Sequence, residues 1–370
     1  MGLSRRFLNL IVEKRIPGAK SLRCIDMMRQ HFFNTRTTQA AAGAAALKME
    51  RIWLPSPSFN FRTTTSSLKE KQMHCFPVGD RRVVCADHSG NCFLVDAEMR
   101  RVVIMPHLHK PKSLPLSLFV PSTDAGDHND GGGSLFVMES APEPEAGCNG
   151  QLSHQFEAFV YRKPTPFYCS KFWHSQLLPR PPFVCDPKYI HNPPKISGGC
   201  RLILLGHSEL HVEPERSWTL PFHGKVEYVP ELKLWFGLSA KDHTLAAADL
   251  SNMDSQPQLV GTWKEVNLPE QWQVSQDPQL VSLGFGRFCI ARFFRTRILN
   301  GGCRDEPSDR YCAVLTGVEM VPSRVHGTNA NEDSSGNGNG GNEKVDLQMI
   351  THKSRRYTSN GSDGAINTVF

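Results

Sequence analysis

The sequence predicts an all-β protein, a kelch-like β-propeller of six or seven degenerate blades. Three observations support this prediction: short β-forming runs recur along the chain, turn residues separate them, and apolar residues with a 3.6-residue period are scarce. The chain has 29 Gly and 26 Pro among 370 residues, so it is rich in residues that form turns and end strands. We therefore interpret residues 1–370 as one propeller-like domain.

The clearest group of strands covers residues 82–106. Strands are expected over residues 82–87, 92–96 and 101–106, with Asp, Gly and Asn between them, which predicts an antiparallel meander. Pro106 ends the third strand, because proline cannot donate a hydrogen bond to a central ladder.

A second group repeats this order, with strands expected over residues 232–238, 244–249 and 259–269. Looser copies cover residues 134–138, 156–161 and 172–179, and residues 280–294, 311–320 and 345–350. Repeats of about 40–50 residues with four strands are typical of propeller blades. We expect the strand Phe7–Val12 to pair with the C-terminal segment, because ring closure removes exposed sheet edges.

Low-complexity segments interrupt these runs at residues 121–133, 139–150 and 323–343, and an alanine-rich stretch covers residues 39–46. The first three segments cannot bury enough apolar surface to offset the entropy of ordering them. We predict that they are loop insertions on the surface of the scaffold.

Hydropathy and charge indicate which kinds of partner the protein is expected to bind. Uninterrupted apolar runs all fall well short of a membrane span, so a membrane protein is not predicted. Residues 1–120 carry 19 Lys and Arg against 8 Asp and Glu, a balance that suits an anionic partner. The charges occur singly or in pairs without a nucleic-acid-binding motif, so we do not predict nucleic-acid binding.

The eleven cysteines are dispersed without a C-x-x-C pair, which argues against a zinc ribbon or a thioredoxin-type site. Cys85, Cys92 and Cys289 lie in apolar runs, where a reduced cysteine acts as a small hydrophobic residue, so a reducing compartment is expected. The apolar run near the start is cut at Glu13, unlike a signal peptide, although nine basic and two acidic residues in the first 48 also suit an organelle transit peptide. We predict a cytoplasmic or nuclear protein.

Several motifs are similar to those of a known family. They are Arg5–Val12, Trp263-Lys264-Glu265 with Pro269 and Trp272, Leu283–Phe294, Thr316–Glu319, Lys353–Tyr357 and Val369-Phe370. With them the chain resembles, over nearly its whole length, the cereal-plant family called domain of unknown function 1668, and Phe288–Phe294 is the most specific motif. The resemblance implies a kelch-like or propeller-like fold and no known activity, substrate or cofactor. The propeller half of F-box proteins is also similar, but the first fifty residues lack the F-box pattern.

One segment is similar to the nucleophile elbow of α/β-hydrolases, because an apolar run leads into Gly206-His207-Ser208. Leu210 replaces the final glycine of that motif, and Pro214 stands where its helix should continue. A strand entering a polar loop explains the segment equally well. We therefore expect that Ser208 is not a nucleophile.

Two histidine pairs have spacings seen in metal sites. His207 and His211 are four residues apart, and His107 and His109 would share one face of a strand. Neither pair has a third ligand at a recognisable spacing, so no metal site is predicted.

Other patterns favour structural roles. Gly284-Phe285-Gly286 lacks the third glycine of a dinucleotide loop, since Cys289 occupies that position, and the glycines at 336–341 have low-complexity surroundings. Asn360-Gly361-Ser362 fits a glycosylation acceptor that a protein outside the secretory route would not use. Five tryptophans are expected in the core between blades, with a ligand-binding rim as the alternative: Trp173, Trp218, Trp235, Trp263 and Trp272.

Together these patterns predict a non-catalytic scaffold that binds an unknown protein partner through loops on one propeller face. No catalytic, cofactor-binding or metal-binding residue is assigned. The alternative is a small-molecule-binding or hydrolytic enzyme that uses the propeller channel or the Gly-His-Ser loop. Titratable residues converging on the propeller axis would favour the enzyme.

Overall fold

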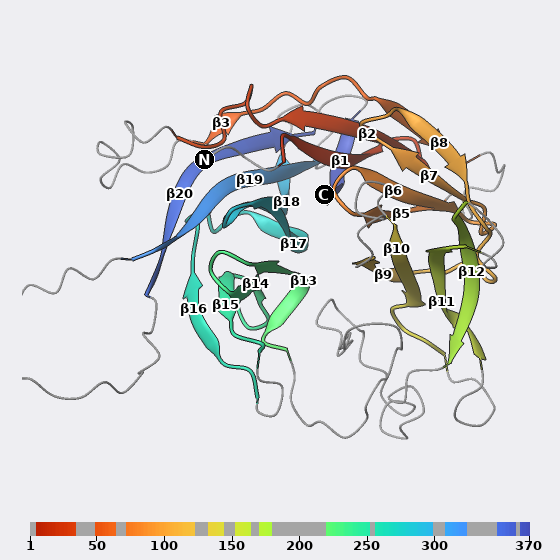
Figure 1. Ribbon diagram of the computed structural model, residues 1–370. Coiled ribbons are helices and arrows are strands. Elements are labelled where there is room, and N and C mark those ends of the chain that lie inside the picture. The colour runs from red at the N-terminus through yellow and green to blue at the C-terminus, as the bar shows by residue number, and fades with distance from the viewer. Residues whose placement is uncertain are drawn as a thin grey trace, which may run out of the picture.

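The computed structural model describes residues 5–34, 49–63, 72–122, 132–143, 152–163, 170–179, 220–251, 256–298, 308–323, 346–359 and 363–370. These residues form 21 strands and no helix. The strands make five sheets that follow one another around a common axis as the blades of a propeller (Figure 1). The all-β propeller class is therefore confirmed.

The first three blades are defined by their strands. Blade I contains β1 (Phe7–Lys14), β2 (Ala19–Asp26), β4 (Phe59–Arg62) and β21 (Asp363–Val369). Blade II contains β5 (Met73–Val78), β6 (Arg82–Asp87), β7 (Cys92–Asp96) and β8 (Arg101–Ile104). Blade III contains β9 (Pro115–Pro121), β10 (Gly133–Glu139), β11 (Leu152–Arg162) and β12 (Phe172–Pro179).

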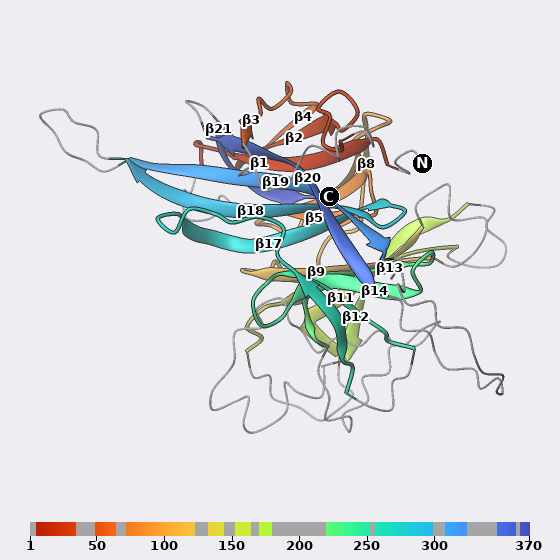
Figure 2. The same ribbon diagram turned by 90° about the vertical axis from the view of Figure 1, so that its left-hand side faces the viewer.

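The last two blades complete the described fold. Blade IV contains β13 (Phe222–Val229), β14 (Leu234–Ser239), β15 (Leu245–Ala248) and β16 (Leu259–Trp263). Blade V contains β17 (Gln273–Gly284), β18 (Arg287–Ile298), β19 (Ser308–Pro322) and β20 (Leu347–Thr358), with the short parallel strand β3 (Glu50–Arg51) at its outer edge. Its long strands β18 and β19 extend past the neighbouring sheets (Figure 2).

Blade I joins the two ends of the chain. β21 pairs antiparallel with β1, and Leu10 lies opposite Val369. This pairing confirms the prediction that the strand Phe7–Val12 pairs with the C-terminal segment.

Inner strands such as β1 are buried on both faces, because blade I packs against blade II on one side and against blade V on the other. Leu10 on β1 faces a buried cluster shared with blade V, whereas the next residue, Ile11, faces a cluster shared with blade II. Blades II and III share a cluster containing Val84 and Leu135, and blades IV and V share one containing Phe236 and Phe288. Burial on two faces explains why these strands are continuous apolar runs in the sequence.

The prediction of six or seven blades is wrong, since the described residues form five. A repeat of about 40–50 residues per blade overestimates the number of blades, because blade V contains strands of up to 15 residues and so uses more of the chain. Long strands consume chain length without adding blades. The meander was predicted correctly, as β6, β7 and β8 pair antiparallel in order.

The predicted insertions lie largely outside the described residues, namely at residues 123–131, 144–150 and 324–343, and the alanine-rich stretch 39–46 lies wholly outside them. The edges of two predicted insertions belong to strands instead: Pro121 ends β9 and pairs with Gly133, and Glu139 ends β10. Among the described residues, no helix is long and apolar enough to cross a membrane.

Candidate functional site

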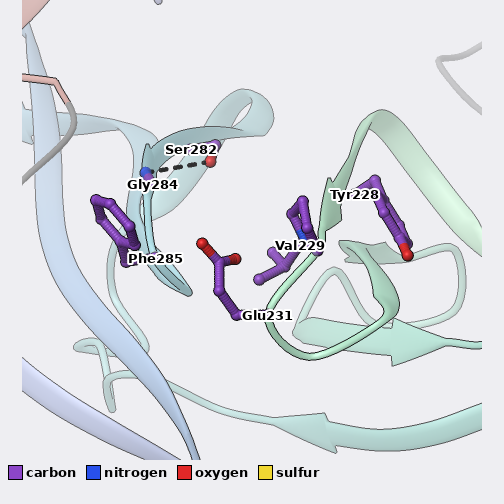
Figure 3. A pocket seen from close by; sticks show the side chains of 7 residues that line it. Tyr228, Val229, Glu231, Ser282, Gly284 and Phe285 are labelled. Carbon is purple, nitrogen blue, oxygen red and sulfur yellow. Dashed lines mark hydrogen bonds between the residues drawn. The ribbon is translucent and has the colours of Figure 1, made fainter.

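A small pocket lies between blades IV and V, where the β13–β14 turn meets the β17–β18 turn (Figure 3). Its volume is about 150 Å³. The residues that line it are Tyr228, Val229, Pro230, Glu231, Ser282, Gly284 and Phe285. Both walls are strand-connecting turns, so the pocket is a feature of one face of the propeller.

The β13–β14 turn fixes the position of Glu231. The Leu232 N–H donates to the Val229 carbonyl at 3.1 Å, and the Lys233 N–H donates to the Pro230 carbonyl at 3.2 Å. Lys233 takes a φ of 53°, which reverses the chain into β14. Leu232 packs against the buried cluster between blades IV and V, while Glu231 stays exposed at the pocket.

The β17–β18 turn holds Phe285 at its tip. Phe285 and Gly286 have φ values of 54° and 71°, the positive pair that a tight type I′ hairpin turn requires. The Met320 N–H donates to the Gly286 carbonyl at 2.8 Å and ties the turn to β19. The Phe285 side chain is 47% exposed. Gly284-Phe285-Gly286 is thus a hairpin turn between two strands, not the entry to a helix that a dinucleotide loop needs.

The polar side chains of the pocket wall that carry ionisable or hydroxyl groups are Glu231, Ser282 and Tyr228. Figure 3 shows Glu231 between Phe285 and Val229. The Ser282 hydroxyl accepts a hydrogen bond from the Gly284 N–H at 3.4 Å, and the lining contains no histidine or lysine that could activate it. An exposed carboxylate beside an aromatic ring is instead suited to a cation.

Beside this turn, partly buried polar contacts hold residues 32–34 against blade V. Arg287 pairs with Glu319 at 3.0 Å, and its guanidinium lies over the Phe33 ring at 5.3 Å. His352 Nε2 lies 3.1 Å from the other Glu319 oxygen, and His352 Nδ1 accepts the Asn34 N–H at 3.1 Å. Burial lowers the pKa of His352, which favours the neutral ring that this acceptor role requires.

A second polar cluster lies between blades II and III. The buried carboxylate of Glu157 pairs with the buried Lys112 ammonium and accepts the backbone N–H of His109 at 2.9 Å. Glu157 and the Ser175 hydroxyl both approach the same ring nitrogen, Nδ1 of His109, at 2.8 and 3.0 Å. A catalytic triad needs the serine and the acid on different ring nitrogens. The cluster therefore does not have the geometry of a catalytic triad, and its contacts join blades II and III.

His107 and His109, which were expected from the sequence to share one face of a strand, do not do so. Residues 105–114 are not a strand, and His109 contacts Glu157 while His107 is exposed. The expectation failed because Pro106 ends the ladder before either histidine. In the described ranges, no three His, Cys, Asp or Glu side chains are placed to hold a metal.

Several residues singled out from the sequence lie outside the described residues. They are Gly206, His207, Ser208, Leu210, His211, Pro214, Trp218, the glycines at 336–341 and the Asn360–Ser362 motif. Four other tryptophans were predicted in the core between blades. Trp173 and Trp263 pack against clusters shared by two blades, whereas Trp235 packs against a cluster within blade IV and Trp272 against one on blade V.

The residues of the pocket were missed as a group. From the sequence, Phe285 was considered only as part of the Gly284-Phe285-Gly286 pattern, and Tyr228 and Glu231 belong to no recognised motif. The usable signal was an aromatic residue between two glycines, a pattern typical of a tight hairpin turn, and turns lie at the protein surface. The pairing of this turn with the β13–β14 turn depends on how blades IV and V pack.

Comparison with known proteins identifies a family to which the chain is similar. A search of curated proteins finds no match. The family model described as "Protein of unknown function (DUF1668)" matches residues 5–203 and 213–357, which together cover most of the chain and include the pocket. The chain belongs to this family of unknown function.

Proposed function

We propose that the protein is a non-catalytic interaction scaffold that binds a partner protein through the turns of one propeller face, centred on the pocket between Glu231 and Phe285. The observation that carries this proposal is the pairing of an exposed carboxylate and an exposed aromatic ring on two rigid turns. We infer that an arginine or lysine side chain of the partner enters between them. The carboxylate would pair with the cation, and the ring face would attract it further.

The size of the pocket supports a side-chain ligand. Pockets for small molecules usually enclose about 300–1,000 Å³, whereas this one encloses about 150 Å³. That volume suits one anchoring side chain, and partner proteins typically gain most of their binding energy from a few such anchors.

The turns also need little ordering when a partner binds. Both are closed by backbone hydrogen bonds, and the β17–β18 turn is further tied to β19. A preorganised surface loses less conformational entropy on association.

We further propose that the protein acts in the cytoplasm or nucleus, where thiols stay reduced. The cysteines of the described residues are free thiols, including Cys75 and Cys85, whose sulfur atoms lie 3.7 Å apart across β5 and β6. Burial raises the pKa of Cys92 and of Cys289 to about 12. These buried thiols are unreactive and serve as small apolar side chains.

The test is proximity labelling in native tissue with three forms of the protein. The site variant is Phe285→Ala/Glu231→Gln. The control variant, Val274→Ala/Glu270→Gln, changes an exposed apolar residue and an exposed acid near the other end of β17. The proposal is supported if the site variant, and not the control variant, fails to label proteins that the wild type labels. One of these proteins, once purified, should also bind the site variant at least tenfold more weakly than the wild type. Identical labelling by all three forms overturns it.

A further inference from the structure

The outermost strand of blade II has an unusual exposure pattern. All four residues of β8 (Arg101–Ile104) are exposed, whereas the inner strands of the same sheet are mainly buried. Val102 is 52% exposed and Ile104 is 88% exposed. Figure 1 shows β8 at the outer rim of the propeller. Adjacent apolar β-branched residues on an open edge are a feature that proteins usually avoid.

The backbone of this strand has groups available for pairing. The Met105 N–H donates to the Cys92 carbonyl at 3.0 Å, so Met105 and Cys92 form a hydrogen-bonded pair. Bonded and non-bonded pairs alternate along an antiparallel ladder, and therefore Val103 bonds to β7 while Val102 and Ile104 direct their N–H and carbonyl groups outward. Within the described part of the chain, no strand pairs with that outer side.

Blade V shows how the same kind of edge is filled. Its last antiparallel strand, β20, is covered by β3 in parallel register. Glu50 of this added segment forms an ion pair with Arg355, and the Ile52 N–H donates to the Arg356 carbonyl at 2.9 Å. Ile52 is 3% exposed. An acid, a backbone ladder and a buried apolar side chain thus hold an extended segment beside two adjacent arginines.

Blade II presents the matching half of such an arrangement. Arg100 and Arg101 stand at the start of β8, and no described acid lies within ion-pair distance of either guanidinium. The nearby acids Asp96 and Glu98 pair with Arg81. The basic pair is therefore available to an acidic residue from outside this sheet.

We propose that β8 is a docking strand, to which an extended segment of a partner protein adds as a fifth strand of blade II. The segment carries apolar residues at alternate positions and an acidic residue that meets Arg100 and Arg101. Backbone hydrogen bonds to Val102 and Ile104 supply affinity, and the alternate side chains supply specificity. This surface is separate from the pocket at Glu231 and does not depend on the function proposed for it.

A second copy of the chain is a poorer occupant. Stable protein interfaces bury about 800 Å² on each partner, and one four-residue strand supplies little of that area. Flanking arginines also place like charges on both copies.

The experiment uses a phage-displayed library of random octapeptides against the full chain, with counter-selection on a Val102→Lys/Ile104→Lys variant. Lysines on an edge oppose strand addition, and because both side chains are exposed the variant should fold with an unchanged thermal transition. We expect enriched peptides with alternating apolar residues and at least one acid. Absence of enrichment over the variant, or a basic consensus, overturns the proposal.

The best enriched peptide is then synthesised with and without N-methyl groups at alternate residues. Methylation should weaken binding at least tenfold, because it removes the ladder donors while keeping the side chains. Arg100→Glu/Arg101→Glu should weaken binding to a similar degree. Val260→Lys, on the edge strand β16 of blade IV, and Phe285→Ala/Glu231→Gln should leave binding unchanged. The proposal is contradicted if the methylated peptide binds as tightly as the unmethylated one. It is also contradicted if sedimentation shows that the free chain dimerises through β8.

Discussion

Asn9 and Phe370 exchange two backbone hydrogen bonds. The Asn9 N–H donates to the Phe370 carbonyl at 2.8 Å, and the Phe370 N–H donates to the Asn9 carbonyl at 2.9 Å. The Phe370 ring is 4% exposed and packs in the cluster shared by blades I and II. The last residue of the sequence is thus part of both the sheet that joins the chain ends and the packing between two blades.

Phe370→Ala should therefore destabilise the protein by about 3–5 kcal/mol, the usual effect of removing a buried phenyl ring. Urea unfolding measures the change. Ile16→Ala, at a residue that is half exposed in a turn, is the control and should cost less than about 0.5 kcal/mol. A cost below about 1 kcal/mol for Phe370→Ala would show that this ring does not help to hold blades I and II together.

Gly286→Ala should cost more than Gly224→Ala. Both glycines have positive φ, and a left-handed conformation costs about 1–2 kcal/mol for a residue with a side chain. A Cβ at Gly286 would also lie 3.0 Å from the Met320 carbonyl oxygen, whereas one at Gly224 would meet nothing within 4 Å. Denaturant unfolding of the two variants compares them directly. Equal losses would mean that the β17–β18 turn shifts freely away from β19.

Glu157→Gln should destabilise the protein by about 3–5 kcal/mol, because it leaves the buried Lys112 ammonium without its counter-charge. The double variant Glu157→Gln/Lys112→Met should recover part of this loss. Glu98→Gln, which breaks the exposed pair with Arg81, should cost less than about 1 kcal/mol. If Glu157→Gln behaved like Glu98→Gln in urea unfolding, the cluster between blades II and III would not be structural.

His352 should make the stability of the fold depend on pH. Because burial lowers its pKa below the ordinary value of 6.5, the unfolded chain binds more protons between the two values. The contribution of His352 to the free energy of unfolding is complete above about pH 6.5 and is lost as the pH falls toward the pKa of the folded state. Over this range the free energy of unfolding changes by at most about 1.4 kcal/mol per pH unit. The groups that face the ring are Glu319, Arg287, Phe33 and the Asn34 N–H.

Unfolding free energies of the wild type and of His352→Gln, measured from pH 7.5 to pH 5, test this dependence. The variant should show a shallower fall. His107→Gln removes an exposed histidine and should keep the slope of the wild type. The same slope in His352→Gln would assign the pH dependence to other groups, such as His74, whose pKa burial also lowers.

The sequence by itself determined the fold class and the local strands. Apolar β-forming runs between turn residues located β6 and β7 at their observed bounds, because strand formation and turn chemistry depend on neighbouring residues. The family also follows from sequence motifs alone. Ring closure by Phe7–Val12 was predictable, since a propeller with unpaired end strands leaves open edges.

Tertiary structure alone decided the number of blades, the pocket and the coverage of the sheet edges. Glu231 and Phe285 are 54 positions apart in the numbering and meet because blades IV and V share one buried cluster. Likewise β3 covers β20 whereas β8 is open, a difference that depends on contacts between residues some 300 positions apart. Such long-range pairings leave no local pattern in the sequence, because they are determined by which surfaces pack together and not by the conformational preferences of neighbouring residues.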